Sequence, residues 1–182
     1  MHTLETGRLT LRMLRESDFE AYAEMAADPE VMRFIGDGKT LSRPLAWRNL
    51  ASMVGHWQLR GYGPWAVEER GTGQLVGRIG FWNPDGWPGF ELGWILRRQF
   101  WGRGYATEGA RAALDFAFTH LVQPEIISLI YPENAASIRV ALRLGEQPAG
   151  RVEIVGRSAL LYRIARAQWV PGSPGSTKEA IE

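Results

Sequence analysis

The sequence predicts an α+β fold with a mostly antiparallel sheet and one or two crossover helices. Short segments of alternating apolar residues between turn formers indicate strands, whereas apolar residues three and four positions apart indicate helices. Two pairs of predicted strands are separated by short turns, which favours antiparallel hairpins. A chain of 182 residues with 45% hydrophobic residues can bury one core. We expect a single domain over residues 1–170 and a disordered tail over residues 171–182.

The first predicted elements are a strand and two helices. Residues 8–14, RLTLRML, alternate apolar and polar side chains as a half-buried strand does. Ser17 and Glu20 have the spacing of a capping box, which predicts the start of a helix. Pro29 must interrupt that helix, and the aspartate before it predicts the N-cap of a second short helix over residues 28–34.

A longer helix and a hairpin follow. Pro44 is typical of a first helical turn, and Gly61 predicts the end of the same helix. Its expected buried face consists of Leu50, Met53, Val54 and Trp57. Residues 64–69 and 75–82 flank the turn RGTGQ, so we expect these two strands to pair with each other.

The second half of the chain alternates strands and helices. We expect strands at residues 90–96, 126–130, 147–155 and 159–165. We expect helices at residues 105–121 and 134–144. The run IISLI at 126–130 is continuously apolar, as a buried central strand would be, and the last two strands predict a closing hairpin.

Composition excludes several classes of function. The net charge is +1 and the arginines alternate with acids, so no basic stripe predicts a nucleic-acid partner. No apolar run reaches 18 residues and the N-terminus lacks a signal-peptide pattern, so we expect no membrane partner and a cytoplasmic location. The absence of cysteine excludes a disulfide scaffold, a thiolate metal site and a cysteine nucleophile. We expect no metal.

The segment 97–109, RRQFWGRGYATEG, places three glycines where a predicted strand ends and a helix begins. This order is typical of an anion site, because the unpaired N–H groups and the dipole of a helix N-terminus favour negative charge. A plain strand-to-helix turn is the alternative. The spacing excludes a P-loop, which needs a lysine that is missing here, and a Rossmann fingerprint, for which Gly109 lies two positions late.

Gln99, Gly102, Gly104 and Ala106 form the pattern Q-x-x-G-x-G-x-A, which resembles motif A of the GNAT N-acetyltransferase superfamily. The segments LETGRLTLRMLRESD, FELGWIL, FWGRGYATEGARAALDFAF and NAASIRVALRLG are similar to those of the RimJ/RimL-type branch, and the resemblance covers roughly residues 3–170. It implies a mixed, mostly antiparallel sheet of six or seven strands, with a split between strands four and five and about four helices.

The resemblance also implies a site for acetyl-CoA as a co-substrate. The backbone of Trp94, Ile95 and Leu96 would hold the pantetheine arm, and Asn134 would reach the cofactor beyond strand five. The pyrophosphate loop would consist of Trp101, Gly102, Arg103, Gly104, Tyr105 and Ala106. Arg98 and Arg103 could add charge-assisted contacts to this anion.

Acetyl transfer to an amine needs a base, and Glu91 is the first candidate. It lies among apolar residues on the strand that precedes the glycine loop, where partial burial would raise its pKa. The alternatives are that Glu91 pairs with an arginine on the solvated face, and that Glu153 or a water chain is the base. Histidine catalysis by His2, His56 or His120 is the weaker hypothesis.

The chain departs from the superfamily pattern at two positions. A tyrosine that acts as general acid in many members is replaced by Ala141, and an aromatic residue after the helix-ending glycine is replaced by Glu146. The first difference directs attention to Ser137, three residues after Asn134, as a hydrogen-bond donor to the leaving thiolate. A helix-capping serine is the alternative.

Together these features predict an acetyl-CoA-dependent N-acetyltransferase that acts by direct attack of a primary amine in a ternary complex, since no cysteine can carry the acetyl group. The acceptor could be a protein N-terminus, an amino acid, a polyamine or an amine drug. The alternative is an inactive acyl-CoA sensor or interaction subunit. Trp82 and Trp87 could form a homodimer patch, and the acidic region of residues 18–30 could attract a cationic acceptor or be a solvated face.

Overall fold

The computed structural model describes residues 2–170 and 178–180 of the chain. They form one mixed sheet of nine strands in the order β7-β8-β6-β5-β4-β3-β2-β1-β9. Its strands are β1 Thr3–Glu5, β2 Leu9–Arg12, β3 Pro64–Glu69, β4 Leu75–Trp82, β5 Glu91–Leu96, β6 Glu125–Ile130, β7 Gln147–Ile154, β8 Arg157–Ala165 and β9 Lys178–Ala180. The predicted α+β class is therefore confirmed, with a wider sheet than expected because short strands extend one edge.

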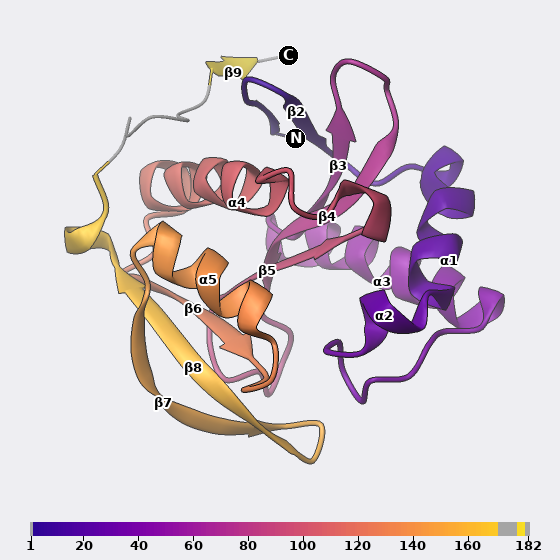
Figure 1. Cartoon of the computed structure of the whole chain (residues 1–182). Helices are drawn as coiled ribbons and strands as arrows, with labels where there is room; N and C mark the ends of the chain where they lie inside the picture. Colours follow the sequence, from indigo (N-terminus) through magenta and orange to yellow (C-terminus); the bar gives the residue numbers. More distant parts are fainter. Residues whose placement is uncertain (1, 171–177, 181–182) are drawn as a thin grey trace.

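Five α-helices within the described residues flank this sheet. They are α1 Phe19–Ala27, α2 Pro29–Met32, α3 Arg43–Arg60, α4 Tyr105–Phe116 and α5 Ala135–Leu144. Short 3₁₀ turns cover Glu16–Asp18, Arg98–Phe100 and Arg166–Gln168, and a π-helical turn, Ala117–Leu121, continues α4. Figure 1 shows α4 and α5 next to each other on one side of the sheet, with α1, α2 and α3 grouped together away from them. No helix in the described part of the chain is long and apolar enough to cross a bilayer.

Most local predictions are confirmed. The pairs β3–β4 and β7–β8 are antiparallel hairpins, and α3 ends at Gly61 in the left-handed conformation with φ 74°. Asp28 caps α2 by accepting a hydrogen bond from the Glu30 amide at 2.9 Å, and Pro29 holds the first helical position. These features depend on neighbouring residues in the chain, which explains why the sequence predicted them.

Three local predictions were wrong. The expected capping box of Ser17 and Glu20 does not form, because the Asp18 side chain accepts from the Arg15 amide at 2.8 Å and pairs with Arg12 at 2.8 Å. The short helix α2 ends at Met32, before residue 34. Val54 is 37% exposed, whereas His56 is buried on the inner face of α3.

The tail prediction concerns residues 171–182. Residues 171–177 and 181–182 lie outside the described part of the chain. Within the tail, Lys178–Ala180 forms β9, which pairs antiparallel with β1. The single-domain boundary at residue 170 stays a prediction.

The split in the sheet lies between β5 and β6, which are the only parallel neighbours among the described strands. Their ladder has one registered pair, Glu91 with Ile127, and the Ile127 amide donates to the Phe90 carbonyl at 3.0 Å. By contrast, β5 pairs with β4 over six positions and β6 pairs with β8 over six. The strands β5 and β6 therefore separate immediately after their first contact.

Candidate active site

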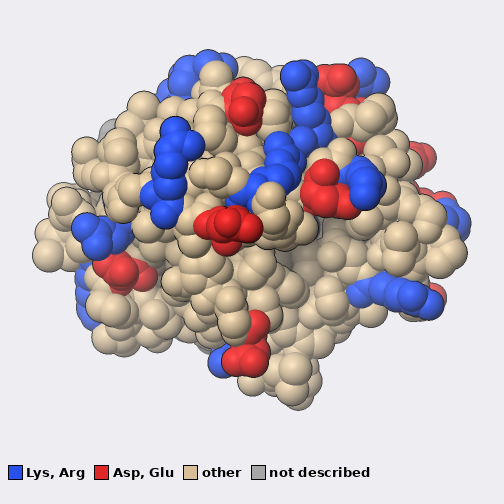
Figure 2. Space-filling model, turned by 90° about the horizontal axis from the view of Figure 1, so that it is seen from below, with Lys and Arg blue, Asp and Glu red and all other residues tan. Residues whose placement is uncertain are grey.

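Two cavities adjoin the split. The larger, about 490 Å³, lies beside the glycine loop and is called the glycine groove below. The smaller, about 220 Å³, contains the Glu91 side chain and is called the Glu91 pocket. Trp94, Asn134 and Ser137 line both cavities, so the two spaces meet at these residues. Seen from below (Figure 2), side chains of both signs are interspersed around a hollow in the surface.

The glycine loop has the backbone geometry of an anion site. Gly102 and Gly104 have φ of 75° and 80°, a left-handed conformation that favours glycine. Gly104 is the N-cap of α4 and no side chain caps this helix, so the first N–H groups of α4 have no side-chain acceptor in the described structure. A Cβ at Gly102 would meet nothing within 4 Å, which leaves the loop open to a ligand.

The structure places most of the expected cofactor residues around the glycine groove. They are Trp94, Ile95, Leu96, Trp101, Gly102, Gly104, Tyr105, Ala106 and Asn134. Arg103 does not line the groove, and its half-exposed side chain lies 3.5 Å from Glu69. The Leu96 carbonyl already accepts a hydrogen bond from the Trp101 indole at 2.8 Å.

The groove contains cations that the sequence did not single out. Arg33, Arg139 and Arg143 line it. Arg98 instead forms an ion pair with Asp28, with 3.2 Å between its Nε and Oδ2 of Asp28. Arg139 and Arg143 are four residues apart on α5 and therefore share one face of the helix, which is a signal that the sequence contained. These arginines and the loop amides fit the pyrophosphate and phosphate groups of a coenzyme A thioester.

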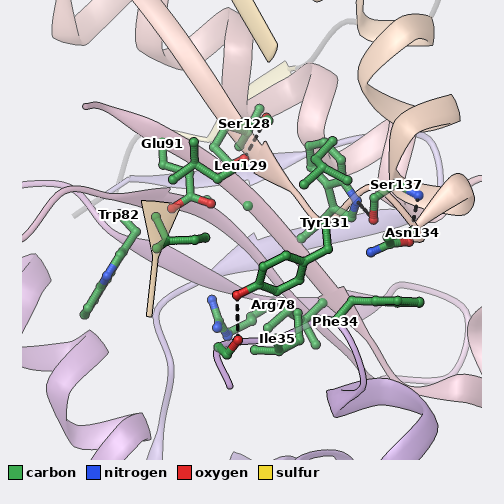
Figure 3. A pocket seen from close by; sticks show the side chains of 18 of the residues that line it. Phe34, Ile35, Arg78, Trp82, Glu91, Ser128, Leu129, Tyr131, Asn134 and Ser137 are labelled. Atoms are coloured by element: carbon green, nitrogen blue, oxygen red, sulfur yellow. Dashed lines mark hydrogen bonds between the residues drawn. The ribbon is translucent and has the colours of Figure 1, made fainter. Parts of the chain in front are cut away.

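Glu91 points into the Glu91 pocket, where the Trp87 indole donates to its Oε2 at 2.7 Å. Burial raises the pKa of Glu91 to about 7, although the Trp87 hydrogen bond and the charge of Arg78 oppose this shift. Figure 3 shows the carboxylate facing the same space as Tyr131. The alternative of an arginine ion pair on the solvated face is not observed among the described residues.

Asn134 and Ser137 form a small unit at the start of α5. The Asn134 Oδ1 accepts from the Ser137 amide at 3.1 Å, so Asn134 is the residue that caps α5. The Ser137 hydroxyl oxygen accepts from the Trp94 indole at 3.1 Å. Because this oxygen already has a donor, the hydroxyl proton of Ser137 is directed away from Trp94 and is available to another acceptor.

Tyr131 is a pocket residue that the sequence analysis missed. It follows β6, lies at the centre of Figure 3 and donates its hydroxyl proton to the Gly36 carbonyl at 2.7 Å. The guanidinium of Arg157 lies 3.7 Å from the centre of its ring. These contacts connect the pocket wall to the loop after α2 and to the hairpin β7–β8.

The other candidate residues lie away from the two cavities. Glu153 is exposed on β7, and neither it nor His120 lines the Glu91 pocket or the glycine groove. His56 is buried, stacks on Trp82 with ring centres 4.6 Å apart, and has a pKa lowered by that burial. Trp82 and Trp87 both line the Glu91 pocket, and their role in a dimer patch stays a prediction.

The acidic region at residues 18–30 is mostly paired with arginines. Glu20 pairs with Arg43, and Glu24 lies 2.8 Å from Arg97. The Asp18 and Asp28 contacts described above follow the same pattern. Ion pairs within the chain therefore explain these acids better than attraction of a cationic acceptor does.

Ser128 joins the two strands where they begin to separate. Its hydroxyl oxygen lies 2.9 Å from the Leu92 carbonyl on β5 and 3.0 Å from Oε1 of Glu146. A hydroxyl has one proton, so Ser128 can donate to only one of these oxygens. Because the Leu92 carbonyl can only accept, the proton shared by Ser128 and Glu146 must come from a protonated Glu146 carboxyl group. Glu146 is fully buried, and burial together with the nearby Glu91 charge raises its pKa to about 8. The carboxyl group of Glu146 is therefore neutral near pH 7.

A split parallel pair, a glycine loop at a helix N-terminus and two cavities that meet define an acyl-CoA-dependent acyltransferase. Residues 8–147 match the family model of the acetyltransferase (GNAT) domain, and the chain belongs to this family. It is thus an acetyl-CoA-dependent acyltransferase.

Relatives and solved structures agree with this assignment. An uncharacterized N-acetyltransferase, p20, of Bacillus licheniformis is 31% identical over 152 residues, covering 82% of this chain and 85% of the relative. An acetyltransferase structure from Agrobacterium tumefaciens is 35% identical with a TM-score of 0.80, covering 89% of this chain and 93% of that one. A RimJ structure from Mycobacterium smegmatis in complex with CoA-disulfide has a TM-score of 0.72 over 90% of this chain and 85% of that one, and at 22% identity it shows the fold alone.

Replacing Glu146 by glutamine tests its protonation. A folded-state pKa raised from 4.5 to about 8 means that the folded protein binds this proton more tightly than the unfolded chain does. Glu146 should therefore lower the free energy of unfolding progressively as the pH rises from about 4.5 to about 8. In thermal melts, we expect the difference in midpoint between Glu146→Gln and the wild type to increase in favour of the variant as the pH rises across this window. Glu133→Gln, at an exposed position, is the matched control. A difference that does not change with pH would contradict the assignment.

Proposed function

We propose that the enzyme transfers the acetyl group of acetyl-CoA directly to a primary amine in a ternary complex, as a cytoplasmic member of the RimJ/RimL-type branch. The observation that carries this proposal is the meeting of the two cavities at Trp94, Asn134 and Ser137. One cavity has a loop with the backbone geometry of an anion site, and the other contains the Glu91 carboxylate, whose pKa is about 7. A thioester in the groove and an amine in the pocket can therefore come into contact without a covalent enzyme intermediate.

The glycine loop and its arginines are proposed to hold the pyrophosphate of acetyl-CoA. Gly102 and Gly104 keep the loop open, and the amides at the start of α4 can donate to phosphate oxygens. Arg139 and Arg143 lie across the groove on α5, where they can neutralise further phosphate charge. Acetyl-CoA supplies the activated acetyl group, and the chain holds and orients it.

Glu91 is proposed to be the general base. Its pKa of about 7 allows it to be ionised in part of the population near neutral pH and still to accept a proton from an ammonium group. The amine, once deprotonated, attacks the acetyl carbonyl carbon, so that a C–N bond forms and the C–S bond breaks. The electron pair leaves with the sulfur as thiolate. The nitrogen, positively charged after attack, loses its second proton, which passes through water to the thiolate, so that a neutral amide and the free thiol of CoA result. Glu91 retains the amine proton until it is released to solvent.

Ser137 is proposed to donate a hydrogen bond to the departing thiolate. Its oxygen is fixed by the Trp94 indole, and its position where the cavities meet is suitable for the sulfur of the cofactor. A serine hydroxyl is too weak an acid to give up its proton fully. Its contribution is therefore stabilisation of charge or a relay through water.

Cofactor binding can be tested by replacing Gly102. CoA at a hundredfold excess over its Kd should stabilise the protein by about 2.7 kcal/mol and raise its thermal midpoint. Gly102→Asp should remove that shift, because a carboxylate would occupy the space of a phosphate and repel it. Gly73→Asp is the matched control, since Gly73 has φ of 69° and equally open surroundings but lies in the β3–β4 turn. Equal CoA shifts in the two variants would mean that the loop does not bind the cofactor.

The role of Glu91 can be tested through the pH dependence of turnover. An acceptor screen over small amines and peptides, with detection of the released thiol, provides the substrate for this measurement. For the wild type, kcat/KM should rise as pH increases through about 7, because Glu91 must lose its proton to act as a base. Glu91→Gln should lower kcat/KM by about 10²–10⁴-fold and remove this inflection. Glu153→Gln, outside both cavities, should retain it. If the pH inflection of kcat/KM near 7 is retained in Glu91→Gln, another group is the base.

Ser137→Ala separates catalysis from folding. Loss of a hydrogen bond to the leaving group should lower kcat by about 10–100-fold while the CoA-induced thermal shift is retained. Asn134 still caps α5 in this variant, so the thermal midpoint should change little. Ser158→Ala, at an exposed site on β8, is the control. An unchanged kcat would show that Ser137 only contacts Trp94.

A further inference from the structure

The Glu91 pocket is lined by one cation and one anion among the described residues, Arg78 from β4 and Glu91 from β5. The register pairs Arg78 with Ile95 and Trp82 with Glu91, so both charged side chains project from the same face of the sheet. Arg78 and Glu91 are offset by four residues along the direction of the strands, which corresponds to roughly 13 Å. Figure 3 shows both side chains directed into the pocket from its walls.

The sheet between these two positions carries no side chains on this face. Gly80 on β4 lies directly opposite Gly93 on β5. A Cβ built at Gly93 would meet nothing within 4 Å, so the space above it is open. A Cβ at Gly80 would instead meet the Gly63 carbonyl oxygen at 2.5 Å, so the open space lies over Gly93. A small ligand placed there would have the cation at one end and the carboxylate at the other.

Arg78 has no anionic partner. Its Nε is shielded from solvent and has no hydrogen-bond partner, and no ion pair forms between Arg78 and any described residue. Arg78 is half-buried, and a partly desolvated guanidinium without an anionic partner is free to bind an anionic ligand. By contrast, Arg12, Arg97 and Arg98 each have a carboxylate partner.

Asn49, a neighbour of Arg78, provides a second hydrogen-bond donor in the pocket. The buried Tyr22 hydroxyl donates to Oδ1 of Asn49 at 2.5 Å, and the electrostatic effect of Arg78 opposes the rise that burial causes in the pKa of Tyr22. Because its carbonyl oxygen accepts from Tyr22, the amide NH₂ group of Asn49 is available as a donor to the pocket that Asn49 lines. Arg78 also contacts the Tyr22 hydroxyl through a side-chain hydrogen bond, which is a neutral acceptor. The guanidinium and the amide therefore face the pocket without an anionic partner.

The catalytic base cannot serve as the lasting partner of Arg78. Glu91 is held by the Trp87 indole, and its pKa stays near 7 despite the positive charge of Arg78. Glu91 also becomes neutral when it takes the proton of the acceptor amine. The charge on Arg78 then remains uncompensated unless the acceptor brings an anion of its own.

We propose that the acceptor is a free amino acid, whose carboxylate binds Arg78 and Asn49 while its amino group faces Glu91. This inference rests on the function proposed above and adds the chemical class of the substrate. Bidentate binding of a carboxylate by arginine is geometrically specific and strong. The remaining walls of the pocket are largely aromatic and favour an apolar side chain on the amino acid: Phe34, Trp82, Trp87 and Tyr131.

The same geometry disfavours two other kinds of acceptor. The N-terminal residue of a peptide has its carboxyl group in an amide bond, so it offers no charge to Arg78. A polyamine would place a second cation near the guanidinium, which like-charge repulsion opposes. Of the acceptors considered from the sequence, only those with an acid group complete the pocket.

The experiment compares matched acceptors with the wild-type enzyme. L-phenylalanine, L-leucine and L-methionine are each measured against their amides and their decarboxylated amines, with thiol detection of CoA release. The amide has a less basic amino group than the acid and the decarboxylated amine a more basic one. A preference for the acid over both compounds therefore cannot arise from amine basicity. We expect kcat/KM to be about 10–100-fold higher for the acid, mostly through KM, as for a hydrogen bond to a charged group.

Substitution of Arg78 tests the assignment directly. Arg78→Met should lower the acid-to-amide ratio of kcat/KM by about 10–100-fold, toward unity, and Arg78→Lys should retain an intermediate ratio. Arg163→Met, at an exposed position on β8, should keep the wild-type ratio. Thermal melts check that each variant is folded. If Arg78→Met does not fold, the comparison of acid, amide and amine with the wild-type enzyme still tests the proposal.

The outcomes separate this inference from the proposed function. Acetylation of amides, amines or peptide N-termini at least as fast as the free acids would overturn the amino-acid assignment and leave the acetyltransferase function standing. Equal losses for acid and amide in Arg78→Met would also overturn it. Absence of acetylation with every class of amine would instead contradict the proposed function itself.

Discussion

The short contact between β5 and β6 determines where the whole site lies. Their registered pairing is confined to Glu91 and Ile127, and the Ser128 hydroxyl joins the Leu92 carbonyl to the neutral carboxyl of Glu146 at this point. Beyond it the strands diverge, and the two cavities adjoin the gap. Ser128 and Glu146 are almost completely buried, so the hydrogen bonds of Ser128 at this contact are protected from water.

The alternation of side chains along β5 gives one strand two roles. Glu91, Gly93 and Ile95 face the side of the sheet that carries Arg78, whereas Trp94 faces α5 and contacts Ser137. A single extended segment thus supplies the base to one cavity and a wall to both. A shift of register by one residue would exchange the two faces and separate Glu91 from the pocket.

Several charged side chains near the site form ion pairs with one another. The net charge is only +1, and several arginines near the site are paired with acids of the first helical region. The exceptions lie where a ligand is expected, with Arg139 and Arg143 at the glycine groove and Arg78 in the Glu91 pocket. Burial raises the pKa values of both Glu91 and Glu146, so the site contains two acids that remain protonated to a higher pH than usual.

The sequence by itself determined the features that depend on neighbouring residues. The glycine loop, the cap at Asp28, the end of α3 at Gly61 and both hairpins follow from local backbone chemistry, and periodicity indicated the main helices and strands. The very short strands β1 and β9 have too few residues for such a signal.

Only the tertiary structure decided which side chains meet. Arg78, Tyr131 and Glu146 have no distinctive local pattern, and they acquire a role because β4, β6 and the end of α5 converge at the split. The same holds for Trp82 and Trp87, which line the Glu91 pocket. Burial and partnership are properties of contacts between residues far apart in the chain, and local patterns do not encode them.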